Sequence, residues 1–198
     1  MKKILKFSLV LAAVVLTAVE AHARKADFSL DLKKEEGKTV SFTLKEIKRI
    51  DLSIYDTSDN LIYQEKVTSE DDINRTYDLT AFPEGIYFLE AESDLKISRY
   101  KIEVFGKVAK LSVDAISEVY KPVLVNKNGT VAFNMLNTSK TPVAVKIYSS
   151  NDTALYNETI SGELNVGKIF DISKVEGDEC TFVITSNGKT FVETVNVK

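Results

Sequence analysis

Side chains that could act as nucleophiles, proton carriers or metal ligands are scarce in this sequence. His22 is the one histidine and Cys180 the one cysteine in 198 residues. His22 lies in an N-terminal segment with the features of a secretory signal peptide, so we expect the mature chain to contain no Ser–His or Cys–His pair and no histidine metal ligand. Cys180 has no partner for an intramolecular disulfide. We therefore predict no catalytic residues and no cofactor, and expect that the protein is not an enzyme.

Two polar segments could in principle bind Ca²⁺, which takes about 6–8 oxygen ligands. They are Asp56–Asn60 and Ser150–Asp152. Neither fits the spacing of a known calcium loop, and Asp and Asn are also the usual residues of tight turns. The sequence predicts no metal site.

Glu193 has an unusual place in the pattern. A two-residue turn at Asn187-Gly188 would set Phe182 opposite Glu193, so the alternation directs this carboxylate towards the core side of its strand. A buried carboxylate without a partner is costly. A bulge or a position at the rim of the sheet explains Glu193 better than a catalytic role with a raised pKa.

Four tyrosines are candidates for a binding surface: Tyr55, Tyr63, Tyr148 and Tyr156. With Ile54 pointing inward, Tyr55 is expected to face solvent, and Tyr148 follows the same rule. Exposed aromatic rings stack on sugars or anchor protein partners. The alternative is a cross-strand aromatic pair that steadies a hairpin. We expect a protein or glycan partner, with the oligomeric state left open.

The N-terminus has the pattern of an export signal. A basic start is followed by an apolar run of thirteen residues, Phe7 to Val19, and by Ala21-His22-Ala23. We predict a signal peptide over residues 1–23. The run is shorter than the roughly 20 residues of a membrane span, and no later segment reaches that length, so no transmembrane segment is expected. The mature protein should be periplasmic, cell-surface or extracellular.

Charge excludes one class of partner. Removing residues 1–23 takes three Lys and one Glu from 26 basic and 29 acidic residues, leaving 23 and 28. The mature chain therefore carries a net charge near −5, which does not favour nucleic acid.

The second half of the sequence repeats the first. Residues 52–104 and 145–197 align at a constant shift of 93 without a gap, with ten identities in 53 positions. Upstream, Thr39–Phe42 matches Thr130–Phe133 at a shift of 91. Two tandem modules explain this, module 1 over 24–105 and module 2 over 106–198, with 106–119 as a linker.

Apolar residues alternate at period two within each module, as in half-buried strands. We expect about seven strands per module. In module 1 they lie near 27–33, 39–45, 50–56, 61–67, 75–79, 86–92 and 97–104; in module 2 they lie near 120–125, 130–136, 143–149, 154–160, 168–172, 180–186 and 189–197. The fold class is all-β, with two tandem immunoglobulin-like β-sandwiches.

A repeated motif predicts a structural corner between two sheets. Asp78 recurs as Asp171, and in module 1 the motif continues through Pro83 and Gly85 to Tyr87. A tyrosine at such a corner buries its ring and returns its hydroxyl to nearby backbone. Module 2 has Cys180 in place of Tyr87, where we expect a buried and unreactive thiol.

The run Asp78-Leu79-Thr80, with Pro83, Gly85 and Tyr87-Phe88-Leu89, resembles the small sandwich modules of type IX secretion sorting domains. The resemblance implies an immunoglobulin-like fold and export. We expect a non-catalytic exported binding or structural protein, connected with cell-surface adhesion or the secretion system. Two alternatives remain: a periplasmic assembly chaperone that donates an edge strand to a client, and a hydrolase that uses carboxylates only.

Overall fold

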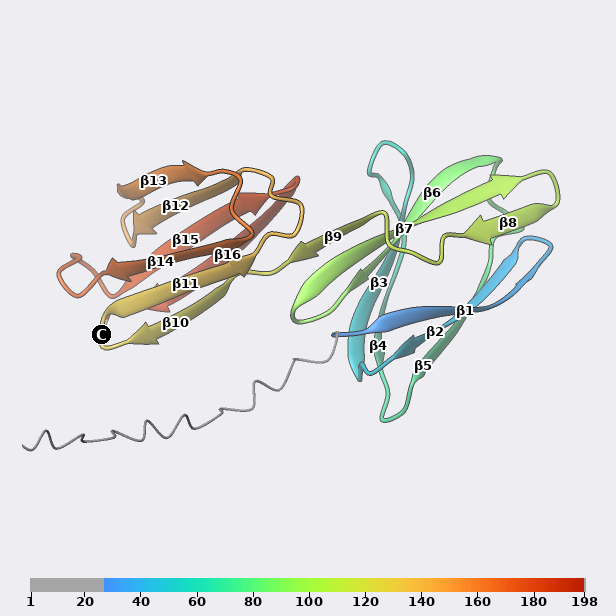
Figure 1. Cartoon of the computed structure of the whole chain (residues 1–198), viewed down its shortest axis with the longest axis horizontal. Coiled ribbons are helices and arrows are strands. Elements are labelled where there is room, and N and C mark those ends of the chain that lie inside the picture. The colour runs from blue at the N-terminus through green and yellow to red at the C-terminus, as the bar shows by residue number, and fades with distance from the viewer. Residues whose placement is uncertain (1–26, 198) are drawn as a thin grey trace, which may run out of the picture.

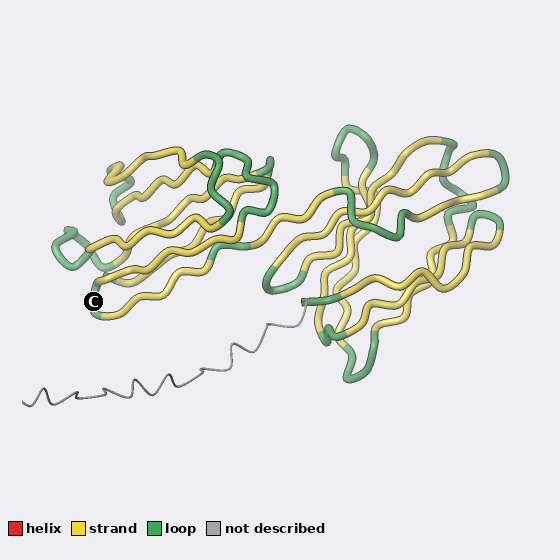
Figure 2. The backbone as a smooth tube through the Cα atoms, in the orientation of Figure 1, coloured by secondary structure: helices red, strands yellow, loops and turns green. Residues whose placement is uncertain are grey.

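The computed structural model describes residues 27–197, and within them every regular element is a β-strand (Figure 2). The expected signal peptide and its cleavage site lie outside the described residues. No helix in the described part of the chain is long and apolar enough to cross a membrane. The expected all-β fold class is confirmed.

Module 1 is a sandwich of two antiparallel sheets (Figure 1). One sheet has the strand order β1-β2-β5 and the other β4-β3-β6-β7-β8, with β9 also paired to β7. The bounds are β1 (Ser29–Glu36), β2 (Thr39–Lys45), β3 (Arg49–Tyr55), β4 (Leu61–Thr68), β5 (Ile73–Asp78), β6 (Gly85–Glu92), β7 (Lys96–Phe105), β8 (Val108–Leu111) and β9 (Ser117–Tyr120).

Module 2 repeats this arrangement with seven strands. Its sheets have the orders β10-β11-β14 and β13-β12-β15-β16. The bounds are β10 (Val123–Lys127), β11 (Thr130–Leu136), β12 (Val143–Ser149), β13 (Ala154–Ile160), β14 (Asn165–Asp171), β15 (Glu179–Ser186) and β16 (Lys189–Asn196). Fourteen strands thus fall where the alternation predicts them, seven in each module.

The repeat extends to the register of the strands. Ile54 on β3 lies opposite Leu89 on β6, and Ile147 on β12 lies opposite Phe182 on β15, which is the same pair shifted by 93. Both outer hairpins also contain a register shift at the matching place, after Ile54 and after Ile147. Two copies of one folding unit account for the duplicated sequence.

Each module has its own core. Alternating residues of the two facing sheets fill it, with Phe42, Leu52 and Leu89 among the fully buried side chains of module 1 and Phe133 and Phe182 in module 2. Burial of these side chains contributes about 1.5–3 kcal/mol each. With no disulfide among the described residues, burial is the main source of stability.

The duplicated motif begins each corner with an Asx turn. Thr80 donates its backbone N–H to Asp78 Oδ1 at 2.9 Å, and Ser173 donates to Asp171 Oδ1 at 3.0 Å. Hydrogen bonds from Thr80 and from Ser173 lower the pKa of the Asp78 and Asp171 carboxyl groups below the ordinary value. Asp at this position closes the turn between the two sheets, which explains why the chain repeats it.

The continuation of the corner differs between the modules. In module 1 the ring of Tyr87 is buried against Phe82, with their centroids 5.0 Å apart, and its hydroxyl donates to the carbonyl of Pro83 at 3.0 Å. This is the backbone contact expected of a tyrosine corner. In module 2 the equivalent Cys180 is fully buried, and burial raises the pKa of its thiol.

The segment 106–119, expected as a linker, contains β8 and most of β9, and both strands pair with module 1. β8 and β9 both pair with β7 along its outer edge. β8 adds Ala109 and Leu111 to the core of module 1, whereas Val119 on β9 packs into the core of module 2. β9 is therefore shared between the two modules, as its position in Figure 1 shows.

Candidate binding surfaces

The four candidate tyrosines lie on the outer hairpins β3–β4 and β12–β13, but their surroundings differ. Tyr63 on β4 is 43% exposed, whereas Tyr55, Tyr148 and Tyr156 are half-buried. The expectation that Tyr55 and Tyr148 face open solvent is therefore only partly met. Tyr55 and Tyr148 keep the regular alternation of their strands, since β3 pairs with β6 and β12 with β15 without a shift. The register shifts after Ile54 and Ile147 lie in the pairing with the outer strands β4 and β13.

Tyr55 is covered by cations. The Arg99 guanidinium lies 6.0 Å from the centroid of the Tyr55 ring, and Lys189 Nζ lies 5.9 Å from it. Lys189 comes from module 2, so Tyr55 forms part of the contact between the modules. Sequence reasoning could not place Tyr55 there, because the lysine lies 134 positions along the chain.

Tyr63 and Tyr156 belong to a polar and aromatic cluster that recurs in both modules at a shift of 93. In module 1, Arg75 Nε contacts the Glu65 carboxylate at 3.0 and 3.1 Å, and the Tyr77 hydroxyl donates to the same carboxylate at 2.8 Å. The ring of Tyr63 meets that of Tyr77 edge-on, with centroids 5.6 Å apart. Burial, reinforced by Glu65, raises the pKa of Tyr77 well above its ordinary value.

In module 2 the same positions hold a related set of contacts. Lys168 replaces Arg75 and binds Glu158, and it contacts the Tyr156 hydroxyl at 2.8 Å. The phenol is supplied by Tyr156 because Phe170 stands where module 1 has Tyr77. The hydrogen bond from Lys168 lowers the pKa of Glu158 and raises the pKa of Lys168 itself. These contacts join the two sheets of each sandwich, which favours a structural role for Tyr156.

The first three residues of β4 are large apolar or aromatic residues that are exposed on module 1. Leu61, Ile62 and Tyr63 are 52%, 45% and 43% exposed. Module 2 has Ala154, Leu155 and Tyr156 at the equivalent positions, of which Leu155 is the exposed large aliphatic residue. We call Leu61–Tyr63 the β4 patch. Of the four candidate tyrosines, Tyr63 is the most exposed.

The contact between the modules is built on a buried carboxylate. Glu90 on β6 is 5% exposed, and Lys189 Nζ at the start of β16 contacts its two oxygens at 2.9 and 2.7 Å. Arg99 on β7 contacts Glu90 Oε1 at 3.3 Å and lies 4.1 Å from the centroid of the Phe88 ring. A carboxylate buried in this way is stable only while its cations stay in place, so these contacts restrain the angle between the modules.

A second ion pair fixes the shared strand. Lys96 on β7 is buried and contacts Glu118 on β9 at 2.5 Å, while Ser98 Oγ donates to the same carboxylate at 2.9 Å. Lys96 Nζ also lies 4.7 Å from the centroid of the Phe28 ring. The strand that enters module 2 is therefore held firmly to module 1.

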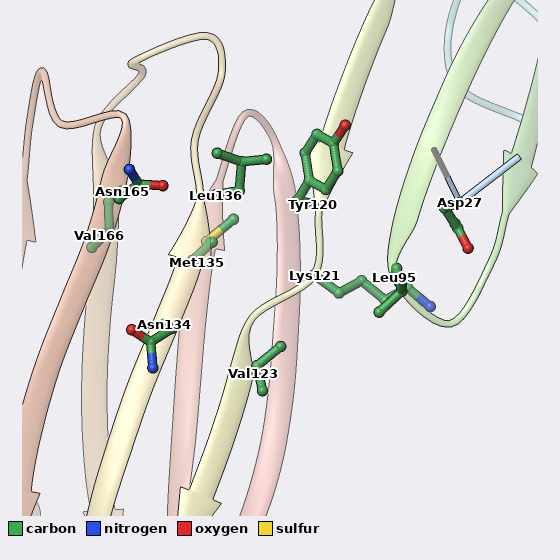
Figure 3. Close-up of a pocket in the computed structure, with 10 residues that line it drawn as sticks. All are labelled: Asp27, Leu95, Tyr120, Lys121, Val123, Asn134, Met135, Leu136, Asn165 and Val166. Atoms are coloured by element: carbon green, nitrogen blue, oxygen red, sulfur yellow. The ribbon is translucent and has the colours of Figure 1, made fainter. Parts of the chain in front are cut away.

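An open cleft of about 510 Å³ lies beside this junction (Figure 3). Leu95 and Asp27 of module 1 border one side, and Tyr120 and Lys121 follow the course of the connection. Module 2 contributes mostly apolar side chains, namely Val123, Met135, Leu136 and Val166, with Asn134 and Asn165 between them. Sequence reasoning did not anticipate this cleft, because its walls come from segments far apart in the chain.

No group of three or more metal-ligating side chains occurs among residues 27–197. In the segment 56–60, Asp56 accepts hydrogen bonds from the backbone of Ser58 and Asn60 and from the Asn60 side chain, which are the contacts of an ordinary turn. Glu193 lies opposite Phe182, as the turn at Asn187 predicts, and its side chain is exposed at the rim of the sheet.

Comparison with known proteins gives one family match. Residues 36–104 match the model of the secretion system C-terminal sorting domain. The match runs from the last residue of β1 to the penultimate residue of β7, so module 1 resembles this domain, and β8, β9 and module 2 lie outside the match. No curated protein matches the chain.

Among solved structures, one similar chain is described as "Biofilm associated protein - BSP domain". The alignment has 15% sequence identity and a TM-score of 0.31, and it covers 84% of this chain and 29% of the other. The chain thus spans less than a third of that protein, and a TM-score this low carries no conclusion about fold or function.

Proposed function

We propose that this protein is a non-catalytic, secretion-associated binding protein that acts at the cell surface, with the two sandwiches working as one rigid unit. The observation that carries the proposal is the match of residues 36–104 to a secretion sorting domain. The matched residues supply most of the core of module 1, with a tyrosine corner at Tyr87. The signal-like N-terminus supports passage across the inner membrane.

The β4 patch is the surface that we propose for a protein or glycan partner. Leu61 and Ile62 immediately precede Tyr63 on an edge strand, and all three side chains are exposed. Tyrosine rings supply large contact areas at interfaces at a low cost in side-chain entropy. The ring of Tyr63 is held edge-on against Tyr77, which orients it before a partner arrives.

Export is tested by following the protein in a host that has a type IX secretion system and in the same host without its outer-membrane translocation pore. We expect the protein at the surface or in the medium of the first host and in the periplasm of the second. Equal amounts outside both hosts would show that export is independent of the system and would refute a role in it.

Binding is tested with the mature chain on a glycan array and against a surface-protein extract. The double variant Leu61→Ser/Tyr63→Ser should lose any binding that the mature chain shows, because two side chains of the β4 patch are removed; thermal melts establish that the variant is folded. Leu155→Ser removes a similarly exposed leucine from the matching hairpin of module 2 and is the matched control. Binding retained by the folded double variant would assign the partner contact to another surface.

A further inference from the structure

The larger sheets of the two modules differ at one edge, which is covered in module 1 and, in the described part of the chain, open in module 2. In module 1 the outer edge of β7 is occupied along most of its length: Ser112 donates its N–H to the carbonyl of Lys101 and Ile116 to that of Arg99, both at 2.8 Å. The equivalent strand of module 2 is β16, which pairs with β15 and with no other strand of residues 27–197. Module 1 therefore shows in the same chain how such an edge is completed.

The orientation of the β16 backbone follows from its pairing. Val197 donates its N–H to the carbonyl of Asp178, towards β15. Since backbone groups alternate along an antiparallel strand, the N–H and C=O of Thr190, Val192 and Thr194 point away from β15. These three residues present unpaired donors and acceptors at the edge, and Val192 is 60% exposed on the outer face.

Glu193 marks the same difference between the modules. Its equivalent in module 1 is Tyr100, which is buried in the core to which β8 also contributes Leu111. With no strand in the place of β8, Glu193 stays exposed although its strand position directs it to the core side. An inward-pointing charge on an edge strand discourages indiscriminate strand addition, so only a strand with suitable residues opposite this carboxylate fits here.

We propose that the occupant of the β16 edge is β16 of a second copy of the protein, in antiparallel pairing about a two-fold axis at Val192. The segment Thr190-Phe191-Val192-Glu193-Thr194 is complementary to itself in this register. Val192 meets Val192 of the second copy, and Thr190 meets its Thr194 on the outer face. Aliphatic and Thr–Thr pairs of this kind stabilise antiparallel strands.

The register also satisfies the restriction that Glu193 imposes. On the inner face each Glu193 lies opposite Phe191 of the second copy, so no two carboxylates stand directly opposite each other. A strand shifted by two residues in one direction would place Glu193 against Glu193, which is unfavourable. The sequence of β16 thus favours the centred register, and the two four-stranded sheets join into one continuous sheet.

A five-residue strand pair is a small interface, so we expect a dimer with a dissociation constant of roughly micromolar or weaker. Sedimentation equilibrium of the mature chain over low micromolar to millimolar concentrations should show reversible monomer–dimer association. Val192→Lys and Val192→Glu should each be monomeric, because like charges then meet at the axis. An equimolar mixture of the two variants should recover the dimer.

Ile169→Lys is the matched control, since Ile169 is 76% exposed on β14 in the other sheet of module 2 and its variant should dimerise as the native chain does. Thermal melts establish that the variants are folded, as expected for changes at exposed positions. A native chain that stays monomeric to millimolar concentration would overturn the proposal. So would a dimer that survives Val192→Lys, or a mixture of the charged variants that stays monomeric.

Discussion

The hydroxyl group of Tyr87 stabilises the corner of module 1 through a single hydrogen bond. Tyr87→Phe keeps the ring against Phe82 and removes the hydrogen bond to the Pro83 carbonyl. We expect the free energy of unfolding to fall by about 0.5–1.5 kcal/mol, as for a typical intramolecular hydrogen bond. Tyr87→Ala should lower it by about 3–5 kcal/mol, because a buried ring is deleted. Urea unfolding of the whole chain measures both changes.

Cys180→Ala provides the comparison in module 2. The side chain is fully buried but small, so its loss should cost less than Tyr87→Ala. A neutral Tyr87→Ala would contradict the structural role of the corner.

Tyr100 makes module 1 sensitive to alkaline pH. Burial, with the nearby charge of Glu118, raises its pKa to about 12 from an ordinary value of 10.0. Below pH 10 both folded and unfolded chains hold the proton. As the pH rises towards 12 only the unfolded chain releases it, so stability falls over this window by on the order of 2 kcal/mol.

The measurement is urea unfolding at a series of alkaline pH values, with ultraviolet absorbance to follow phenolate formation. Tyr100→Phe should make the unfolding free energy fall less steeply between pH 10 and pH 12. Tyr63→Phe is the control, because Tyr63 is exposed. An identical pH dependence in native chain and Tyr100→Phe would show that another group is responsible.

At the scale of the element, strand alternation was enough to locate the seven repeated strands of each module, because Val40, Phe42 and Leu44 or their equivalents recur at period two. β8 and β9 were missed. Each has four residues, and neither has a repeated counterpart in module 2 to strengthen a weak pattern. Their pairing depends on the exposed edge of β7, which a local pattern does not contain.

The contribution of β8 can be measured by truncation. A protein of residues 24–105 holds the seven repeated strands of module 1 and should fold. A protein of residues 24–116 also holds β8, and its unfolding free energy should be higher by about 2–4 kcal/mol because Ala109 and Leu111 are buried. Equal stability of the two fragments in urea would mean that β8 does not complete the core.

At the scale of the whole molecule, the junction is the part of the candidate site that sequence reasoning could not reach. Glu90, Arg99 and Lys189 are ordinary residues as sequence, and only the packing of one sandwich against the other brings them together. The same packing decides that Tyr55 is covered while Tyr63 is open. Period-two patterns describe one strand at a time and carry no information on how two modules meet.

Lys189→Met tests whether the junction holds the modules at a fixed angle. The change removes one of the two cations at Glu90, while Arg99 remains, so each sandwich should stay folded. We expect a wider distribution of distances between spin labels placed on the two modules. Lys66→Met is the matched control, because Lys66 pairs with Asp51 inside module 1. An unchanged distribution for Lys189→Met would show that the contact between Lys189 and Glu90 does not set the angle.

The equal registers of the two modules have a consequence for how the chain folds. The spacing of side chains on β3 is compatible with pairing to β6 or to β15, and the spacing on β12 is compatible with the same two strands. Neighbouring modules can therefore exchange strands during folding. The corner makes the correctly paired sandwich more stable than the strand-exchanged one. A swapped sandwich would bring Cys180 where Tyr87 fills the core and would lose the bond to Pro83, which makes the exchanged product the less stable one. The sequence difference between the two copies at this corner therefore favours the correct strand pairing.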